Sequence, residues 1–376
     1  MSYDAAVLGL GGMGSAALAH LALRGRKVIG FERFEPAHAM GSSHGDSRII
    51  RQAYPLDSRY VPLVLRAYEL WRELQTFAER PVLRTTGGLF IGRPQTRTIA
   101  GGLASVREHG IAHELLDAPA LRRRFPALRP HDDELALYEP ASGIVFPETA
   151  ILAHVRRAIR AGAQARFGCP VSAWEATPGG VRITTEGGET VEAERLVITA
   201  GAWFAQVAPD LGLPLQVERN VMHYFAAADA ADEAQLAQLP VYVVERDAGR
   251  IYGFPLLPET GLKIAFYRSY DFVSPDSVDR TVNAAEVPPM RAYLKDLIPA
   301  AAGANRESRV CLYTLTPDEH FVIGLHPAHP QVAVAGGFSG HGFKFCSVVG
   351  EILADLATEG TTRHAIAMFD PARFRN

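Results

Sequence analysis

Residues 3–23 read YDAAVLGLGGMGSAALAHLAL, an apolar run interrupted by glycines at positions 9, 11, 12 and 14. Residues 3–8 predict a short buried strand, residues 16–23 predict a helix that ends before Gly25, and residues 27–32 predict a second strand. The run is almost long enough to imitate a membrane or signal segment, but no basic region precedes it and the glycines would weaken a membrane helix. The pattern therefore predicts the opening strand, turn, helix and strand of an α/β protein.

The glycines of this turn have the spacing of a dinucleotide-binding fingerprint. Gly9, Gly11 and Gly14 match G-x-G-x-x-G, and Glu32 ends the second strand 18 positions after Gly14. Gly9 allows the tight turn, Gly11 lets the backbone approach a pyrophosphate, and Gly14 lets helix and strand pack closely. The helix N-terminus attracts the pyrophosphate, and Glu32 can accept hydrogen bonds from the adenosine ribose. A glycine-rich turn can be only a turn, but strand, helix and acid in register predict dinucleotide binding.

Two later segments favour FAD over NAD. Residues 194–203, ERLVITAGAW, predict a buried strand that runs into Ala200 and Gly201. Residues 332–337, VAVAGG, predict another strand, followed by a helix over about residues 344–358. Glycine contacts spread over the whole chain are typical of an extended FAD, whereas an NAD domain completes its site in one stretch. Both segments can also be ordinary strands of the same sheet, which does not exclude contact with a flavin.

Composition limits the class of protein. The chain has 376 residues, 48% of them hydrophobic and 21% charged, which predicts a globular protein of two domains or one domain with a large insertion. A net charge of −3 offers no overall attraction for nucleic acid. Cys169, Cys311 and Cys346 are too few and too unevenly spaced for a disulfide scaffold or a zinc cluster. We therefore expect a cytoplasmic protein that binds neither metal, nucleic acid nor membrane.

Domains interleaved along the chain are predicted from the remaining strands. Residues 221–225, 241–244, 250–255 and 263–267 have the spacing of a mostly antiparallel sheet, which would cap the flavin and leave the active site between the domains. The expected fold class is α/β, with a Rossmann-type FAD-binding domain interleaved with a substrate domain. The FAD-binding domain is predicted over residues 1–82, 139–213 and 310–376, and the substrate domain over residues 83–138 and 214–309.

Lysine is rare, because nearly every basic residue is arginine. The four lysines are Lys27, Lys263, Lys295 and Lys344. Lys263 and Lys344 stand in apolar or glycine-rich stretches, where a lysine retained among arginines suggests chemistry that arginine cannot perform.

Three further motifs resemble one known family. GSSHGDSRIIR at residues 41–51 is followed by YVPL at 60–63, VCLYT at 310–314 precedes PDEHF at 317–321, and GFSGHGFKF occupies 337–345. In this order behind the fingerprint they resemble the monomeric sarcosine oxidase and N-methyltryptophan oxidase family, nearly end to end. The resemblance implies a monomeric FAD enzyme that oxidises the C–N bond of a secondary amino acid to an imine. It further implies O2 as acceptor, release of H2O2, and formaldehyde plus an amino acid after hydrolysis of an imine from an N-methyl substrate.

The resemblance also implies roles for single residues. Cys311 matches the cysteine that forms a thioether to the flavin 8α carbon, although alone it reads as a small buried residue. Arg51, helped by Lys344, matches the group that binds the substrate carboxylate, for which a forked guanidinium is suited. Arg48 matches a residue over one flavin face. Lys263 matches the lysine that promotes reaction with O2, and its other interpretation is a solvated lysine on an edge strand.

Two positions depart from the family pattern. Tyr267 stands where the family commonly has histidine, and Ser43-His44 replaces a pair of histidines. His44 can serve the active site or make a structural hydrogen bond, and Tyr252 and Tyr313 can shape the pocket or belong to the core. The substrate stays open among sarcosine, N-methyltryptophan, proline-like and larger N-methyl amino acids.

The candidate site follows from the fingerprint, the glycine segments and the resemblance. The catalytic candidates are Lys263, Arg48, His44 and Tyr252. The substrate-binding candidates are Arg51, Lys344, Tyr313 and Tyr267. The candidates for FAD contact are Gly9, Gly11, Gly12, Met13, Gly14, Glu32, Arg33, Ser42, Ser43, Arg48, Ile49, Val171, Ala200, Gly201, Trp203, Cys311, Phe338, Gly340, His341, Gly342, Phe343 and Lys344.

Two other functions are compatible with the same fold. An amino-acid dehydrogenase would pass electrons to a quinone or a partner protein, but it would gain nothing from an oxygen-promoting Lys263. A catalytically silent flavin-binding protein would not need Arg48, Arg51, Lys263, Cys311 and Lys344 together.

Overall fold

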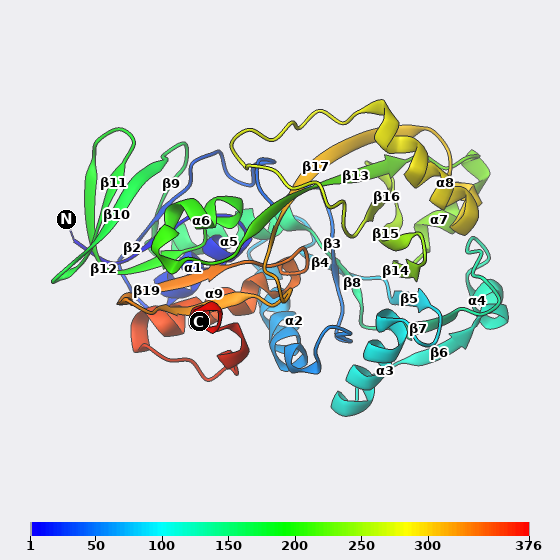
Figure 1. The fold of residues 1–376 in the computed structure, drawn as a ribbon, viewed down its shortest axis with the longest axis horizontal. Coiled ribbons are helices and arrows are strands. Elements are labelled where there is room, and N and C mark those ends of the chain that lie inside the picture. Colours follow the sequence, from blue (N-terminus) through cyan, green and yellow to red (C-terminus); the bar gives the residue numbers. More distant parts are fainter. Residues whose placement is uncertain (1, 376) are drawn as a thin grey trace.

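Residues 2–375 are described by a computed structural model, in which two large sheets stand side by side along the longest axis (Figure 1). The first sheet, at the left of the view, is built from both ends of the chain and from its middle. The second sheet, at the right, is built from the segments between them. A small three-stranded sheet contains β3 (Arg48–Ile50), β8 (Gly143–Val145) and β4 (Leu83–Thr85) in that order.

The first sheet has a parallel centre in the order β9, β2, β1, β12, β19. An antiparallel hairpin extends it beside β12, and β18 pairs antiparallel with β19. This arrangement confirms the predicted α/β class, because consecutive parallel strands need helical crossovers. Its strands are β1 (Tyr3–Leu8), β2 (Val28–Phe31), β9 (Gln164–Arg166), β10 (Val171–Thr177), β11 (Gly180–Thr185), β12 (Thr190–Ile198), β18 (Val322–His326) and β19 (His329–Gly336).

The second sheet has the order β17, β13, β16, β15, β14, β5, β7, β6. All of its pairs are antiparallel except β14 with β5, so the prediction of a mostly antiparallel sheet is confirmed. Its strands are β5 (Gly88–Gly92), β6 (Glu114–Asp117), β7 (Leu135–Glu139), β13 (Gln216–Phe225), β14 (Val241–Arg246), β15 (Gly249–Leu257), β16 (Gly261–Phe266) and β17 (Asn305–Leu315). The division into two domains stays a prediction, and β17 runs across the boundary that it places between residues 309 and 310.

The helices are distributed between the two sheets. Their bounds are α1 (Gly12–Leu23), α2 (Val61–Gln75), α3 (Arg97–His109), α4 (Ala118–Arg124), α5 (Pro147–Arg160), α6 (Phe204–Val207), α7 (Glu233–Ala237), α8 (Val287–Leu297) and α9 (Cys346–Glu359). None of the helices within residues 2–375 is both long and apolar enough to cross a bilayer.

Helix α1 is apolar on nearly every side because it is covered by α5 and α9 as well as by the sheet. A Cβ at Gly350 of α9 would lie 2.5 Å from the Cβ of Ala16, so the crossing of the two helices depends on that glycine. The position of the fingerprint helix α1 therefore depends on α9, which lies near the C-terminus.

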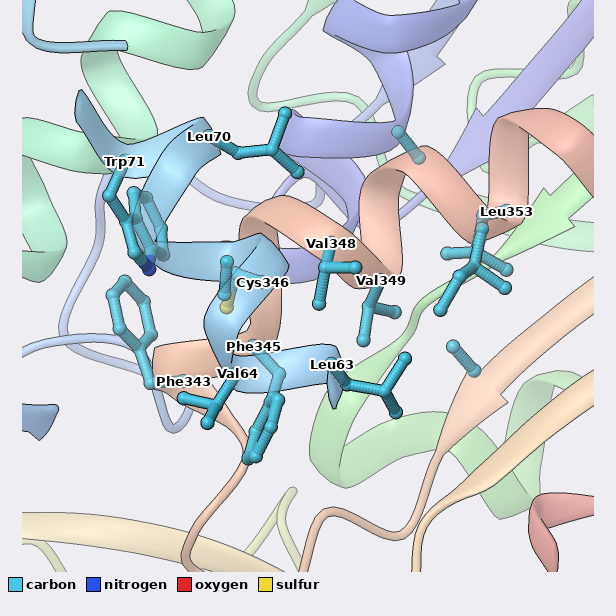
Figure 2. Packing of buried hydrophobic residues seen from close by; sticks show 14 of the residues in the cluster. Leu63, Val64, Leu70, Trp71, Phe343, Phe345, Cys346, Val348, Val349 and Leu353 are labelled. Carbon is cyan, nitrogen blue, oxygen red and sulfur yellow. The ribbon is translucent and has the colours of Figure 1, made fainter. Parts of the chain in front are cut away.

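Helix α2 packs its apolar face on α9 and on the turn before it (Figure 2). Trp71 of α2 stacks on Phe343 in this cluster, which also contains Leu63, Val64, Phe345 and Val349. The indole of Trp71 is fully buried, and its Nε1 donates a hydrogen bond to the backbone oxygen of Lys344 at 2.9 Å. The core thus fixes the backbone of a candidate site residue.

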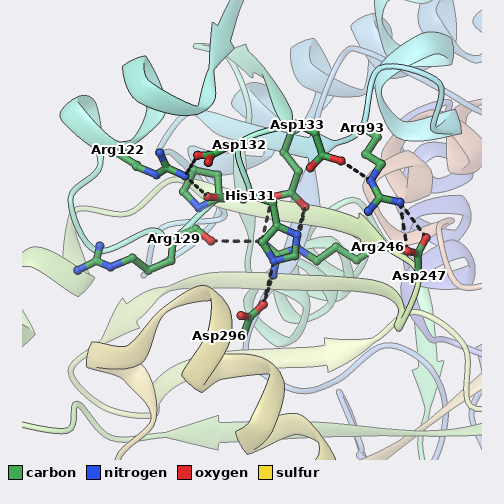
Figure 3. A network of polar contacts seen from close by, with 11 residues as sticks. Arg93, Arg122, Arg129, His131, Asp132, Asp133, Arg246, Asp247 and Asp296 are labelled. Atoms are coloured by element: carbon green, nitrogen blue, oxygen red, sulfur yellow. Dashed lines mark hydrogen bonds and ion pairs between the residues drawn. The ribbon is translucent and has the colours of Figure 1, made fainter.

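An ion-pair network joins the segment before β7, the β14–β15 turn and α8 (Figure 3). Arg246 donates to both carboxylate oxygens of Glu134, and both side chains are almost completely buried. Arg246 also pairs with Asp296 of α8, and Arg93 pairs with Asp133 and Asp247. Because a buried charge is costly without a partner, the Arg246–Glu134 pair fixes the end of β14 against the segment before β7, whereas the pairs with Asp133, Asp247 and Asp296 are exposed.

Candidate active site

A cavity of about 1020 Å³ is lined by residues of both large sheets. Sites for single small molecules measure about 300–1,000 Å³, so this one has room for a large cofactor together with a substrate. It begins at the turn between β1 and α1 and reaches Tyr252 of β15 and Tyr313 of β17.

The glycine turn shows why each of its glycines is needed. Gly9 has a φ of +87°, and a Cβ on it would lie 2.6 Å from the Thr199 oxygen. A Cβ on Gly14 would lie 1.8 Å from the Gly9 oxygen, and one on Gly12 would lie 2.5 Å from the Cys346 Sγ. These three glycines are therefore required by the packing of the protein itself.

Gly11 is different, because a Cβ there would meet only the Ser43 Oγ, at 3.8 Å. Gly11 lines the cavity and precedes the first residue of α1, which has no side-chain cap. Packing does not explain a glycine here, whereas the close approach of a pyrophosphate to the helix N-terminus does. The turn accordingly fits FAD, and Gly11 is the residue whose identity the cofactor explains.

Glu32 is buried at the end of β2 and lines the cavity. Its carboxylate accepts hydrogen bonds from the Leu10 N–H at 2.8 Å and the Phe34 N–H at 3.1 Å. Oε1 also faces Nε2 of His38 at 3.3 Å, and that nitrogen carries the proton of the neutral ring because Nδ1 of His38 accepts from the Met40 N–H. Oε2 keeps a lone pair that can accept from a ribose hydroxyl.

Most of the candidate residues are brought to the cavity wall, and four are not. Those behind the wall are Gly14, His44, Lys263 and Cys311. The ones that line it are Gly9, Gly11, Gly12, Met13, Glu32, Arg33, Ser42, Ser43, Arg48, Ile49, Arg51, Val171, Ala200, Gly201, Trp203, Tyr252, Tyr267, Tyr313, Phe338, Gly340, His341, Gly342, Phe343 and Lys344.

Cys311 lies in β17 and is 1% exposed. Its Sγ is 3.6 Å from Nη2 of Arg48, which lines the cavity, and 3.7 Å from the Ser42 oxygen. Arg48 also donates to the backbone oxygens of Ser42 and Ser47, at 2.8 Å each. The cysteine thus lies directly behind the arginine and the residue 41–48 loop.

Lys263 lies in β16 and is fully buried. Its ammonium donates to the backbone oxygens of Gly45 at 2.6 Å and Ser47 at 2.8 Å, which leaves one of its three N–H groups. Burial, followed by the charge of Arg48, lowers the pKa of Lys263 well below its usual value. This loop-facing position contradicts the picture of a solvated edge lysine.

His44 is buried in the same loop, and neither ring nitrogen has a hydrogen-bond partner among the described residues. Burial and the nearby arginines and Lys263 lower the pKa of His44 to about 3, so the ring is neutral. The structure does not show the structural hydrogen bond that was the alternative for this residue.

Arg51 and Lys344 bring two cations to another part of the cavity wall. The Arg51 guanidinium lies over the rings of Tyr54 and Phe90, with Cζ 5.6 Å and 5.0 Å from their centroids. Lys344 donates to the His341 oxygen at 2.7 Å and keeps two N–H groups. Neither cation forms an ion pair with a carboxylate of residues 2–375. Mainly because of burial, the pKa of Arg51 is lowered and that of Lys344 falls well below its usual value. An anion between them would relieve this cost.

Three tyrosines complete this part of the wall. The hydroxyls of Tyr252 and Tyr313 are 3.4 Å apart, and the Tyr267 hydroxyl donates to the Ser339 oxygen at 3.2 Å. Burial raises the pKa of each tyrosine, so all three hydroxyls stay protonated. Tyr267 thus offers a neutral, oriented ring where the family pattern has histidine.

Tyr54 and Arg250 are among the residues of this wall that were not predicted from the sequence. Tyr54 bonds to Nδ1 of His341 and lies beneath the Arg51 guanidinium. Arg250 also lines the cavity. The only sequence signal for Tyr54 is its spacing of three residues from Arg51. Arg250 has no sequence signal, because arginine is the common basic residue of this chain and nothing in the sequence separates Arg250 from the surface arginines.

Asp210, His326 and His329 gather near the β18–β19 turn, with ligand atoms within 4.8 Å of one another. Nδ1 of His326 accepts from the Ala328 N–H, so the neutral ring carries its proton on Nε2, which faces Asp210 Oδ2 at 3.1 Å. In this tautomer His326 has no lone pair to offer a cation.

Comparison with known proteins adds to this geometry. Residues 4–356 match the family described as FAD dependent oxidoreductase. The chain is 48% identical to a monomeric sarcosine oxidase of Streptomyces avermitilis, over 99% of this chain and 98% of that one. It is 34% identical to an N-methyl-L-tryptophan oxidase of Salmonella arizonae over 100% of both chains. Among solved structures, NikD, an amino acid oxidase essential for nikkomycin biosynthesis, superposes with a TM-score of 0.87 at 26% identity, covering 98% of this chain and 97% of that one.

Proposed function

Because the chain belongs to the family of FAD dependent oxidoreductases that includes the monomeric sarcosine oxidases, we propose that it oxidises the C–N bond of N-methyl amino acids. The product is an imine, which water converts into formaldehyde and the amino acid. The observation that carries this proposal is the pair of unneutralised cations, Arg51 and Lys344, in a cavity that begins at the dinucleotide turn.

FAD, when bound, would supply the acceptor for the two electrons and hydrogen of the C–H bond next to the nitrogen, while the nitrogen loses its own proton and the C–N bond becomes C=N; it would also supply the centre at which O2 is reduced to H2O2. The residues of the chain bind and orient the substrate. Arg51 offers a forked pair of N–H donors to the planar carboxylate, and Lys344 adds one or two more. Two charged donors fix the carboxylate, and with it the position of the N-methyl group.

The same cations select the protonation state of the amine. Arg48, Arg51 and Lys344 give this part of the wall a positive potential, which disfavours an ammonium group. A neutral amine keeps the nitrogen lone pair that oxidation requires. The protonated hydroxyls of Tyr252 and Tyr313 can donate to it without removing a proton, so no strong base is needed.

Lys263 is proposed to promote reaction with O2. The first electron transferred to O2 makes an anion, and a nearby ammonium stabilises it. The two backbone oxygens that hold the Lys263 ammonium pre-orient the remaining N–H. This role favours an oxidase over a dehydrogenase that passes electrons to another acceptor. We further propose that the protein acts as a monomer in the cytoplasm.

An anaerobic panel of amines tests the proposed reaction. Purified protein is mixed with sarcosine, N-methylalanine, N-methyltryptophan, proline and the primary amine glycine, and flavin absorbance is followed. We expect secondary amino acids to bleach the flavin and glycine to leave it yellow. Turnover in air is then measured as peroxide formed without a dye acceptor and as dye reduced when one is added. A protein that no secondary amine bleaches, or one that makes only traces of peroxide but reduces the dye rapidly, contradicts the proposal.

Cys311 is proposed to link FAD covalently. We expect wild-type protein to keep its yellow colour in the pellet after acid denaturation, and Cys311→Ser to release the flavin into the supernatant. Cys169→Ser is the matched control, since Cys169 also lies in the cavity wall but outside the motif. Flavin in the supernatant of denatured wild-type protein would show that the thioether is not formed.

A further inference from the structure

A further cation, Arg250, lines the cavity at the start of β15. Its Cζ lies 3.6 Å from the ring centroid of Tyr267, so the guanidinium stacks on the face of that ring. The Tyr267 backbone N–H donates to the Arg250 oxygen at 2.8 Å, and its hydroxyl is held by Ser339. The ring is thus fixed at both ends, and it orients the guanidinium without using the N–H donors along the guanidinium edge.

Carboxylates near Arg250 are already engaged elsewhere. Glu319, which also lines the cavity, lies 3.0 Å from Arg97 and 3.7 Å from Arg268. Glu245 stands opposite Arg250 in the β14–β15 register, and it accepts from the Thr98 N–H at 2.8 Å. No carboxylate within residues 2–375 forms an ion pair with Arg250.

Arg250 belongs to the same part of the cavity as the two carboxylate-binding cations. Its charge and that of Arg51 both act on the buried Tyr54 and His341, and Lys344 acts on His341 as well. One substrate carboxylate can occupy Arg51 and Lys344. A single carboxylate leaves Arg250, which is half-buried in the cavity wall, with its N–H donors turned to no anion.

We propose that Arg250, stacked on Tyr267, is a subsite for a second carboxylate, and that the enzyme takes dicarboxylic N-methyl amino acids. This inference rests on the proposed function and names its substrate class. The α-carboxylate binds Arg51 and Lys344, the side-chain carboxylate binds the edge of the Arg250 guanidinium, and the N-methyl group is held between them. Tyr267 acts as a positioning residue, because its ring face holds the guanidinium in place.

The test compares two substrates of the same shape and different charge. N-methyl-L-glutamate and N-methyl-L-glutamine are assayed for kcat/KM with the flavin-loaded enzyme, and the ratio of the two values is the readout. Wild type is expected to prefer the glutamate by about 10- to 100-fold, the size of a charge-assisted hydrogen-bonded pair. Arg250→Gln is expected to bring the ratio close to one, whereas Arg250→Lys, which keeps the charge but loses the fork, retains part of it.

A binding measurement gives a second readout that needs no turnover. Glutarate and butyrate are titrated into the flavin-loaded protein, and Kd is taken from the change in flavin absorbance. Wild type is expected to bind glutarate about 10-fold or more tightly than butyrate, and Arg250→Gln to lose that preference. Arg195→Gln removes one charge from an exposed arginine of β12 and is the control, expected to match wild type in both assays.

The two proposals fail in different ways. A protein that oxidises sarcosine but treats N-methyl-glutamate and N-methyl-glutamine alike, in wild type and in Arg250→Gln, overturns the role of Arg250 and leaves the proposed function standing. A protein that oxidises no secondary amine refutes the proposed function, while the glutarate titration still decides whether Arg250 binds a second carboxylate. A glutarate preference that persists in Arg250→Gln places the second anion elsewhere and overturns the inference.

Discussion

Replacing Lys263 with methionine is expected to slow the reaction of the substrate-reduced protein with O2 by about 10²–10³-fold, the cost of removing one charged group that stabilises a developing anion. Methionine keeps the unbranched apolar stem of the side chain but brings no charge to the loop at Gly45 and Ser47. Anaerobic reduction by substrate needs the cations at Arg51 and Lys344 instead, so its rate should change far less. Stopped-flow absorbance measures both half-reactions separately.

The matched control for this variant is Lys295→Met, on an exposed position of α8. It loses the same charge at a residue that does not line the cavity and should leave both rates unchanged. Equal slowing of reduction and reoxidation in Lys263→Met would show that Lys263 supports the structure of the loop and does not specifically promote the reaction with O2.

Replacing Gly14 with alanine is expected to leave the protein without FAD and to lower its free energy of unfolding by about 3 kcal/mol or more, at or above the upper range for overpacking. The new Cβ would lie 1.8 Å from the Gly9 oxygen and 2.5 Å from the Thr199 Oγ1. A Cβ has no rotamer by which to avoid backbone, so α1 must move away from β1. That movement displaces the N–H groups that face the pyrophosphate. Urea unfolding and the ratio of flavin to protein absorbance measure the two effects.

Gly179→Ala is the control for the added methyl group. Gly179 lies in an exposed turn, and a Cβ there meets no atom within 4 Å. The variant should bind FAD and unfold as wild type does. A fully yellow Gly14→Ala protein with an unchanged urea midpoint would contradict the packing described for the fingerprint.

Local pattern was sufficient for the first strand, turn and helix, because each of these forms from neighbours in the chain. The strand at residues 3–8 is confirmed as β1, and the predicted helix is confirmed but starts four residues earlier, at Gly12. The antiparallel strands 221–225 to 263–267 are also confirmed. Their short apolar runs, rich in β-branched and aromatic residues, are typical of strands buried on both faces, as these are. The parallel pairing of β14 with β5 was not predicted, because it joins segments about 150 residues apart and has no local signal.

The same limit applies to the site. Arg48, Arg51 and Lys344 were identified through motifs, and the structure brings them to one cavity. The partnership of Arg250 with Tyr267 depends on the pairing of β15 with β16 and on the backbone bond that follows it, which a motif does not encode. Gly12 was predicted only because it lies within the fingerprint. The structure shows that it must be glycine because Cys346, more than 300 residues later in the chain, packs against it.

The position of β19 and α9 has a consequence for biosynthesis. When the fingerprint turn leaves the ribosome, the strand that completes its sheet beyond β12 and the helix that covers α1 have not yet been made. The N-terminal third therefore emerges with an apolar helix that lacks its final cover, a state that attracts chaperones and aggregates when it persists. We expect nascent chains that stop before residue 329 to capture no flavin. Cofactor uptake would then follow the synthesis of β19 and α9 instead of occurring while the rest of the chain is translated.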